Sequence, residues 1–290
     1  MILYRSLLFV PGAQEEVLAK AGRFPADILC LDLEDSVPSE EKTSARELVR
    51  AAVPELAKGG RSIHVRVNSI ESGLTRGDLA AAVQPGLAGV LLAKAQSPQD
   101  VRDVDVLLRE QELAHEVGPG TVELIVAIES ARALLRCEEI SRASTRLVAL
   151  ALGGEDFTFD MGVARTRDGR ELDYARSFVA TCARAAGLVA LDTPWTDIGD
   201  IDGLVADAER AKVVGFGGKY LIHPDHLEPL HRVFSPSEEE VAAARKLLAA
   251  WEEAQGRGLG VVQFDGRMLD GPIAERARHV IAQAEAIGSR

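Results

Sequence analysis

The run Ile28-Leu-Cys-Leu-Asp-Leu-Glu-Asp35 decides the fold, because it joins a continuous apolar stretch to a group of acids. An uninterrupted apolar run of this length is typical of a strand buried on both faces, as in a parallel sheet. The carboxyl ends of such strands are where α/β proteins place their ligands. Residues 28–35 therefore predict a buried parallel strand with acids at a functional edge.

Similar runs recur along the chain and alternate with helical patterns. The predicted strands are Ser6–Val10, Ile28–Leu33, Ser62–Val67, Gly89–Lys94, Glu123–Ile128, Leu147–Leu152, Leu188–Asp192 and Lys219–His223. The predicted helices are Ala13–Arg23, Ser39–Ala57, Ser97–Val117, Ser130–Ser141, Tyr174–Ala186 and Asp200–Val214. Eight strands alternating with helices favour an α/β fold of the (β/α)8 TIM barrel type. A doubly wound sheet stays open as an alternative, since periodicity alone does not separate the two.

The rhythm changes after the eighth run. A long helical pattern at Pro236–Gln255 is followed by a glycine-rich hinge at residues 256–260, a short strand at Val261–Phe264, a turn and a final helix at Ile273–Ile287. This segment exceeds what a barrel needs. We therefore predict a TIM barrel over residues 1–232 and a C-terminal helical extension over residues 233–290.

Composition excludes several classes of protein. The net charge of −12 does not suit nucleic-acid binding, so a phosphorylated ligand needs a local basic cluster. The three cysteines, Cys30, Cys137 and Cys182, match no metal or redox motif, and we expect a reducing cytoplasm. The N-terminus lacks a basic region and a cleavage site typical of a signal peptide. No uncharged apolar run approaches the ~20 residues of a membrane span.

The predicted strands end in polar residues at the edge where a barrel gathers its side chains. The residues at these ends are Asp32-Leu-Glu34-Asp35, Arg66 and Asn68, Lys94, Glu129, Gly153-Gly154-Glu155-Asp156, Asp192 and His223. Any one of them is also explained as the polar end that every strand needs. The regular placement of the whole set favours a functional site.

Carboxylates outnumber cations in this set. Glu34, Asp35, Glu129 and Asp156 would repel one another in a shared pocket unless a cation neutralised them. Hard oxygen ligands favour Mg²⁺ or Mn²⁺, and zinc is disfavoured because no His or Cys set has the right spacing. Arg66 at the same edge has the planar fork that binds a carboxylate. The glycines before Glu155 allow close approach of backbone N–H groups to a substrate oxygen.

Several motifs resemble the HpcH/HpaI aldolase and citrate lyase β-subunit superfamily, in its citrate lyase β-like branch. They cover essentially the whole chain in family order: Arg5–Gly12, Leu31–Val37, Val65–Asn68, Ala127–Ala131, Leu152–Phe157, Gly215–Lys219, Ile222–Pro224 and Asp265–Pro272. Small departures are Arg267, where lysine is common, and Gly154, where alanine is common. Each motif is weak alone, and the ordered set is specific.

The resemblance implies a Mg²⁺-dependent carbon–carbon lyase that acts on a 3-hydroxyacyl-coenzyme A thioester of the citramalyl-, malyl- or citryl-CoA type. The products would be acetyl-CoA and a 2-ketoacid. It also implies a homotrimer or hexamer in which the C-terminal extension closes over a neighbouring subunit. The acid after Met-Leu, Asp270, would then be the proton donor or acceptor across that interface.

The resemblance also implies roles for the residues at the strand ends. Glu129 and Asp156 would hold the metal, with Glu34 and Asp35 in its outer shell through water. Arg66 would bind the substrate carboxylate, and the backbone around Gly154, Glu155 and Asp156 would bind the ketoacid. For the phosphates of coenzyme A, the basic residues near the first strand and helix are Arg5, Lys20 and Arg23; solvated surface charges explain these three nearly as well.

Three other interpretations stay open. The first is the β subunit of a citrate lyase complex, which acts on a citryl-acyl-carrier protein with α and γ partner subunits. The second is a metal-dependent aldolase for free hydroxy-ketoacids, which is disfavoured because such aldolases lack this extension. The third, from a different class, is a non-catalytic binding or scaffold barrel. Glu129, Asp156 and Asp270 are all present, which disfavours the last.

Overall fold

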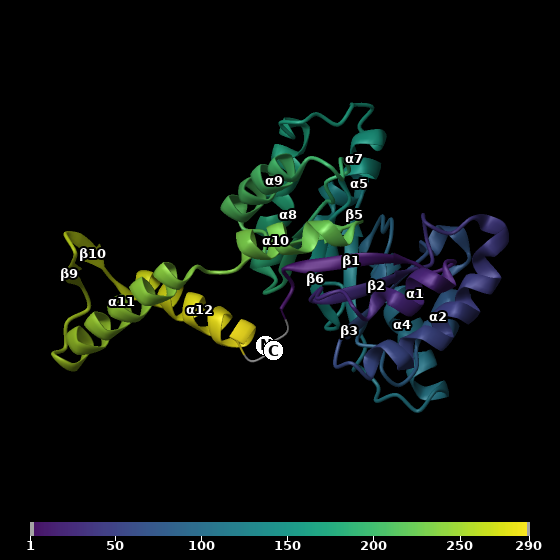
Figure 1. Cartoon of the computed structure of the whole chain (residues 1–290), viewed down its shortest axis with the longest axis horizontal. Coiled ribbons are helices and arrows are strands. Elements are labelled where there is room, and N and C mark those ends of the chain that lie inside the picture. The colour runs from purple at the N-terminus through teal and green to yellow at the C-terminus, as the bar shows by residue number, and fades with distance from the viewer. Residues whose placement is uncertain (1–2, 289–290) are drawn as a thin grey trace. The chain divides into compact units, whose positions relative to one another are not determined.

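The computed structural model describes residues 3–288, and its central feature is a closed barrel of eight parallel strands (Figure 1). The strands are β1 (Ser6–Pro11), β2 (Ile28–Asp32), β3 (Ser62–Val67), β4 (Gly89–Leu92), β5 (Glu123–Ile128), β6 (Leu147–Leu152), β7 (Val189–Asp192) and β8 (Gly218–Leu221). Each strand pairs with the next, and β1 also pairs with β8 to close the ring. The predicted (β/α)8 barrel is confirmed, and the doubly wound sheet is excluded.

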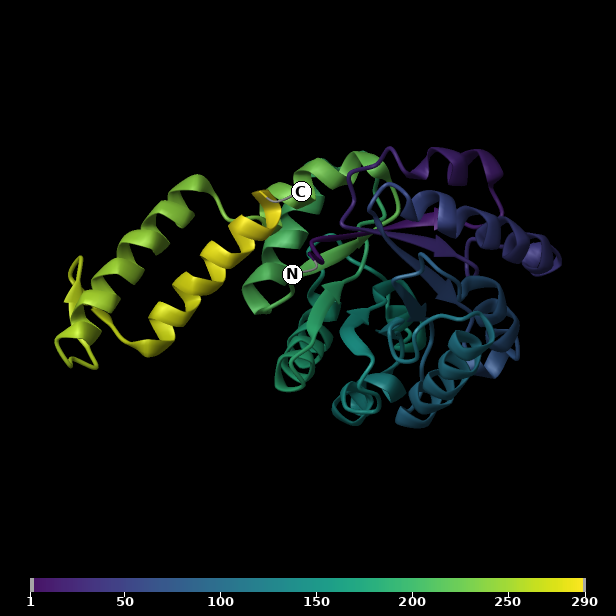
Figure 2. The ribbon, with the colours of Figure 1, turned by 90° about the horizontal axis from the view of Figure 1, so that it is seen from below.

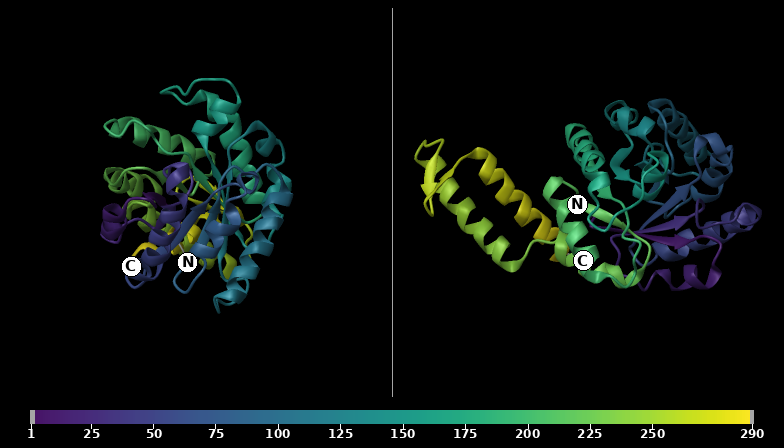
Figure 3. Two further views of the ribbon diagram at one scale, coloured as in Figure 1. Left: turned by 90° about the vertical axis from the view of Figure 1, so that its right-hand side faces the viewer. Right: turned by 90° about the horizontal axis from the view of Figure 1, so that it is seen from above.

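Helices connect the strands and surround them on the outside (Figures 2 and 3). They are α1 (Glu15–Ala21), α2 (Lys42–Ala57), α3 (Thr75–Ala82), α4 (Pro98–Ala114), α5 (Ala131–Leu135), α6 (Cys137–Ser141), α7 (Gly154–Asp160), α8 (Asp173–Ala185), α9 (Ile201–Val214) and α10 (Leu227–Phe234). Over residues 3–288, no helix combines the length and apolar character that crossing a lipid bilayer requires.

The barrel interior is apolar in the middle, because the strands supply continuous runs of buried side chains. Leu7, Cys30, Leu91 and Ile125 pack there with Tyr220. This packing confirms Cys30 as a core residue and keeps the strands in register. These packed side chains fill the barrel beneath the carboxyl ends of the strands, where the polar residues of the site lie.

A buried ionic tetrad joins the last two strands to the helices outside them. The cations of Arg176 (α8) and Lys219 (β8) contact the carboxylates of Asp192 (β7) and Asp207 (α9) at 2.5–2.9 Å. All four side chains are at most 3% exposed. Two cations balance two anions, which satisfies the requirement that buried charges be paired.

The chain divides into two compact units. Residues 4–230 form the barrel unit, and Leu3 with residues 231–288 forms the second. The second unit contains α11 (Glu238–Gly256), the hairpin strands β9 (Val262–Phe264) and β10 (Arg267–Leu269), and α12 (Gly271–Gly288). The helices α11 and α12 lie side by side, with the hairpin at one end of the pair (Figures 1 and 3). Trp251, Leu269 and Ala274 form the core of this unit.

Three helices and one strand were absent from the sequence prediction. They are α3, α7, α10 and β10, and the predicted helix Ser130–Ser141 is divided into α5 and α6 at Arg136. Glycine weakens the helical signal in α3 and α7. Gly77 in α3 has a physical reason, because a Cβ there would lie 2.9 Å from Cζ of Arg46, which packs across it.

Candidate active site

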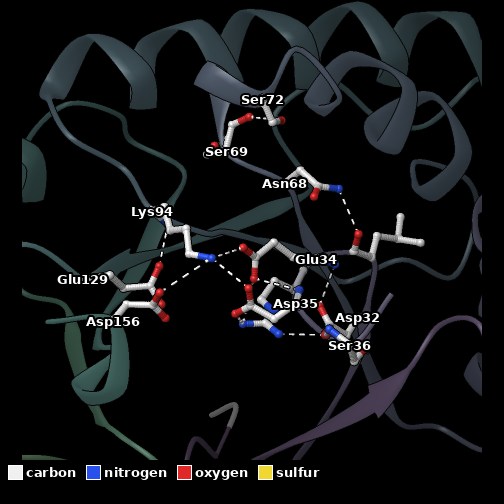
Figure 4. Close-up of polar contacts among 12 residues, drawn as sticks. Asp32, Glu34, Asp35, Ser36, Asn68, Ser69, Ser72, Lys94, Glu129 and Asp156 are labelled. Carbon is white, nitrogen blue, oxygen red and sulfur yellow. Dashed lines mark hydrogen bonds and ion pairs between the residues drawn. The ribbon is translucent and has the colours of Figure 1, made fainter. Parts of the chain in front are cut away.

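The acids predicted from the sequence converge at the carboxyl ends of neighbouring strands (Figure 4). Glu34 and Asp35 follow β2, Glu129 follows β5 directly, and Asp156 lies in the first turn of α7 after β6. Lys94, two residues past β4, lies among them. The barrel topology therefore brings together residues that are up to 122 positions apart in the chain, since residues 34 and 156 both contact Lys94.

Arg66 and Asp32 form the anchor of this cluster. The Nε and Nη2 groups of Arg66 donate to the two carboxylate oxygens of Asp32 at 2.6 and 2.7 Å, and its guanidinium lies 4.4 Å from the ring centre of Phe9. Its Nη1 group faces Glu34 at 3.1 Å and Asp35 at 3.3 Å. Burial opposes ionisation of Asp32, but the guanidinium outweighs it and lowers the pKa of the carboxyl. Arg66 is thus held rigidly with one nitrogen turned to the cluster.

Lys94 connects the acids to one another. Its ammonium lies 2.5 Å from Oε1 of Glu34, 2.7 Å from Oδ1 of Asp35 and 3.7 Å from Oδ1 of Asp156. Burial opposes the charge on Lys94, but hydrogen bonds to Asp35 and Glu34 raise the pKa of the ammonium. The site therefore contains a fixed cation as well as its acids.

Glu129 is the most enclosed of the acids, with 7% of its surface exposed. Burial, together with the charge of Asp156, raises the pKa of Glu129 to about 7. The backbone N–H of Lys94 donates to its Oε2 at 2.6 Å. A Cβ on Gly153 would lie 2.3 Å from its Oε1, so the glycine makes the space that the carboxylate occupies. Burial likewise raises the pKa of Glu34 to about 7.

The loop that carries Glu34 and Asp35 is fixed from below. The ammonium of Lys42 donates to the carbonyls of Leu33 and Glu34 at 2.7 Å each and to Oδ1 of Asn68 at 2.9 Å. The amide of Asn68 also donates to the Leu33 carbonyl. These bonds hold a short loop that would otherwise have unpaired carbonyl groups.

The donor chemistry of the cluster fits a hard divalent cation. Within residues 3–288, no three His, Cys, Asp or Glu side chains converge as a ready-made ligand set. Glu129 and Asp156 can supply two carboxylates, and water or a bound substrate would supply the remaining oxygens. Mg²⁺ is commonly bound in this way, because it keeps several waters and takes one or two carboxylates.

The backbone donors of α7 are distributed differently from the sequence expectation. The N–H of Gly154 donates to Oγ1 of Thr193 at 2.9 Å and is therefore engaged within the protein. Helix geometry leaves the N–H groups of the first turn without intrahelical acceptors, so those of Glu155 and Asp156 can bind a ligand. The side chain of Glu155 is paired with Arg165 at 2.9 Å. Gly154 thus contributes space and packing, which corrects its expected role as a donor to substrate.

Asp270 belongs to the second unit and begins α12. Its Oδ1 accepts the N–H of Ile273 at 3.2 Å, as in a helix N-cap, and its side chain is partly buried. Such a bond fixes the orientation of the carboxylate. Its second oxygen, Oδ2, is the one that we assign to proton transfer below.

The three basic residues expected at coenzyme A phosphates lie elsewhere. Arg5 precedes β1 and is buried in a bidentate pair with Asp27, which precedes β2, so both belong to the amino end of the barrel. Lys20 ends α1 and Arg23 follows it, and α1 runs back from the carboxyl end of β1. The structure does not bring any of them to the acid cluster. Arg5 is engaged within the protein by Asp27, and a contact of any of the three with coenzyme A stays a prediction.

Two other residues of the strand ends make contacts outside the acid cluster. Asp192 turns into the buried tetrad, and His223 contacts Asp225. Conversely, the sequence reasoning gave no role to Asp32, Lys94 or Lys42. Asp32 and Lys94 could have been recognised by their positions, because they lie at strand ends like the assigned acids. Lys42 lies in a helix, and no feature of the sequence pointed to it.

Comparisons with known proteins agree with this geometry. The profile of the family "HpcH/HpaI aldolase/citrate lyase" matches residues 5–224. Citrate lyase subunit beta of Escherichia coli K12 is 40% identical over 286 residues, covering 99% of this chain and 95% of that protein. A (3S)-malyl-CoA thioesterase of Cereibacter sphaeroides is 36% identical, covering 99% and 96%. The crystal structure of CitE from Mycobacterium tuberculosis with magnesium, acetoacetate and coenzyme A superposes with a TM-score of 0.78 at 30% identity, covering 98% of each chain.

Proposed function

Because the chain belongs to the HpcH/HpaI aldolase/citrate lyase family, we propose that it is a Mg²⁺-dependent carbon–carbon lyase. Its substrate is a 3-hydroxyacyl-CoA thioester of the citramalyl-, malyl- or citryl-CoA type. The products are acetyl-CoA and a 2-ketoacid.

One observation carries the proposal: a buried glutamate, a neighbouring aspartate and a rigidly held arginine share the carboxyl end of one barrel. Glu129 and Asp156 supply oxygens for a cation (Figure 4). Arg66 turns Nη1 toward Glu34 of the same cluster, at 3.1 Å. This set matches a substrate that has both a hydroxyl and a carboxylate. Relatives over the full length of the chain act on thioesters by name, and a similar structure contains magnesium and coenzyme A.

Each residue has a task in the cleavage direction. Arg66 binds and orients the carboxylate of the substrate through Nη1, while Asp32 and Phe9 hold the guanidinium in place. Mg²⁺, when bound, stabilises the negative charge that develops on the substrate oxygens. The N–H groups of Glu155 and Asp156 face the carboxylate of the departing ketoacid.

Asp270 closes the proton balance. The substrate hydroxyl gives its proton to solvent, the bond between C2 and C3 breaks, and its electron pair becomes the enolate of the thioester. The acetyl carbon then gains a proton from Oδ2 of protonated Asp270, which regains a proton from solvent. In the condensation direction the same oxygen removes that proton. We propose that the C-terminal extension packs on a neighbouring subunit, in a homotrimer or hexamer, so that Asp270 of one chain completes the site of another.

The test is a Mg²⁺-dependent assay of the purified chain with citramalyl-CoA, malyl-CoA and citryl-CoA. Release of acetyl-CoA together with the ketoacid, lost in both Asp270→Asn and Glu129→Gln, is the expected result. Product analysis separates this activity from thioester hydrolysis, which would release free coenzyme A and the intact hydroxyacid instead. A hydrolysis product alone would contradict the lyase proposal.

The shared site has its own test. Asp270→Asn and Glu129→Gln chains, each inactive alone, are unfolded together and refolded as a mixture. Activity returns only if the two residues of one site come from different chains, because some sites then contain both native residues. A mixture that stays inactive, while refolded native protein is active, would place both residues of a site on the same chain.

The alternative is the β subunit of a citrate lyase complex with α and γ partners. It is favoured by the 37–40% identity to citrate lyase beta subunits over nearly the whole chain. In that case a folded, Mg²⁺-binding protein is inactive on all three CoA thioesters and cleaves citryl-acyl-carrier protein.

A further inference from the structure

Lys94 is the residue through which the acids of the site contact one another. Its ammonium is within 2.7 Å of Glu34 and Asp35 and 3.7 Å from Asp156, while its main-chain N–H holds Glu129 (Figure 4). One residue therefore touches all four acids of the cluster, two of them by short ionic contacts.

The backbone of Lys94 is in the left-handed region, with φ of 51°. This conformation is unfavourable for a residue with a Cβ and is best tolerated by glycine or asparagine. Backbone strain of this kind persists only where the surroundings enforce it, and it concentrates at functional sites. In this conformation the Lys94 N–H donates to Oε2 of Glu129 at 2.6 Å. The backbone of Lys94 is therefore strained in the conformation that places its ammonium among the acids.

The ammonium divides the four acids into two pairs. Glu34 and Asp35 are occupied by Lys94 and by Nη1 of Arg66, whereas Glu129 receives only a main-chain N–H from Lys94. The carboxylates available for direct contact with a cation are therefore those of Glu129 and Asp156. Glu34 and Asp35 stay close but are held back.

This division matters for which cation the site accepts. Ca²⁺ takes six to eight oxygen ligands in flexible geometry, while Mg²⁺ keeps several waters and needs only one or two carboxylates. A site with four available carboxylates would suit Ca²⁺. A site with two, and a fixed positive charge beside them, suits Mg²⁺ completed by water and substrate.

We infer that Lys94 is the metal-selectivity residue of this site: by engaging Glu34 and Asp35 it limits the direct protein ligands to Glu129 and Asp156 and so excludes Ca²⁺ in favour of Mg²⁺. The inference rests on the proposed metal site. It adds a positioning role for a residue that touches no substrate atom, acting through the carboxylates that it restrains.

The experiment is calorimetric titration of Mg²⁺ and of Ca²⁺ into the full-length protein, with no substrate present. The variants are Lys94→Met, which removes the charge and keeps the length, and Lys94→Asn, which removes the charge and suits the left-handed backbone. The control is Lys58→Met, which removes an exposed lysine paired only with Glu55. Thermal unfolding confirms that each variant is folded.

In both Lys94 variants we expect Ca²⁺ to bind at least about tenfold more tightly. The substitution frees the carboxylates of Glu34 and Asp35 and removes one positive charge that repels the cation. Mg²⁺ affinity rises less, so the preference for Mg²⁺ shrinks, and Lys58→Met matches the native protein. An unchanged ratio of Ca²⁺ to Mg²⁺ affinity in a folded variant that still binds Mg²⁺ overturns the inference alone. Absence of any cation binding in the native protein and in both variants overturns it together with the proposed metal site.

Discussion

The main-chain N–H of Lys94 donates a 2.6 Å hydrogen bond to Oε2 of Glu129, which ties the loop after β4 to the acid that follows β5. The bond fixes a carboxylate that is buried and whose pKa is raised to about 7. A buried acid of this kind is costly to ionise without a partner, which supports the proposed role of Glu129 as a ligand for a cation.

Exchange of Glu129 for glutamine separates the contribution of this residue to activity from its contribution to the stability of the fold. The amide oxygen still accepts the Lys94 N–H, so we expect the fold to persist. At pH 8 without Mg²⁺, the free energy of unfolding should stay the same or increase by about 1 kcal/mol, because a neutral amide replaces a desolvated carboxylate. Lyase turnover should fall by two orders of magnitude or so. Urea denaturation and the coupled assay measure the two effects, and a strongly destabilised but active variant would contradict this view.

Gly153→Ala tests the space reserved for Glu129. The new Cβ would lie 2.3 Å from Oε1 and 2.4 Å from Cγ of Glu129, so the carboxylate must move. We expect a loss of about 1–3 kcal/mol in stability from overpacking, and a larger proportional loss of Mg²⁺ affinity and turnover. The control is Gly199→Ala, where the nearest atom is 3.8 Å away. Equal Mg²⁺ affinity in Gly153→Ala and native protein would show that the carboxylate does not need this position.

The buried tetrad predicts a large effect on stability. Lys219→Met leaves the enclosed carboxylates of Asp192 and Asp207 with Arg176 and, for Asp207, the half-exposed Arg210 at 3.3 Å. Removal of one partner from a buried ionic group costs about 3–5 kcal/mol, and we expect that decrease in urea denaturation. Lys58→Met, at a surface pair, should change the free energy of unfolding by less than about 0.5 kcal/mol. A cost below about 1 kcal/mol for Lys219→Met would mean that water reaches the tetrad.

His64 gives the folded protein a defined sensitivity to acid. The ring of this β3 residue is fully buried, and burial lowers its pKa to about 3. In the unfolded chain the imidazole takes up a proton below its ordinary pKa of 6.5, whereas in the folded protein it does so only near its lowered pKa of about 3. The unfolded state therefore binds more protons between these values, and stability falls as the pH decreases from 6.5 toward 3.

The size of this effect is testable with a substitution. At pH 5 the contribution of His64 amounts to about 2 kcal/mol of lost stability, by the linkage of protonation to unfolding. In His64→Gln the difference in unfolding free energy between pH 7 and pH 5 should shrink by about that amount. His115→Gln, at an exposed position, is the matched control. Parallel pH profiles for His64→Gln and the native protein would refute the assignment.

The fold was largely predictable because the barrel strands are continuous apolar runs. The predicted strand over residues 28–33 corresponds to β2 at Ile28–Asp32, and the predicted strand over residues 219–223 overlaps β8 at Gly218–Leu221. The helices α7 and α10 were missed because Gly154 and Pro229 interrupt the pattern at or near their first turns. In these places packing against the barrel overrides a weak local preference.

The acids and Arg66 of the cluster were predicted from the sequence, whereas the contacts made by the ammonium groups of Lys94 and Lys42 were not. A position after a strand places Glu129 and Asp156 at the carboxyl end, whatever their side chains do. The direction of the Lys94 side chain depends on a left-handed backbone angle that no periodicity reveals. Arg5 was considered for the coenzyme A phosphates because of its charge, but it precedes its strand, and a residue before a strand lies at the opposite end of the barrel. Position relative to the strand was thus the stronger signal, and charge alone was the weaker one.

The clamp formed by Asp32 and Phe9 around Arg66 has a thermodynamic consequence. A free arginine loses up to about 2 kcal/mol of side-chain entropy when it is immobilised. Here folding has already immobilised the guanidinium, through two bonds to Asp32 and contact with the ring of Phe9. A carboxylate that arrives at Nη1 therefore meets a donor that is already ordered, so that binding loses no further side-chain entropy of the arginine, although the carboxylate competes there with Glu34 and Asp35.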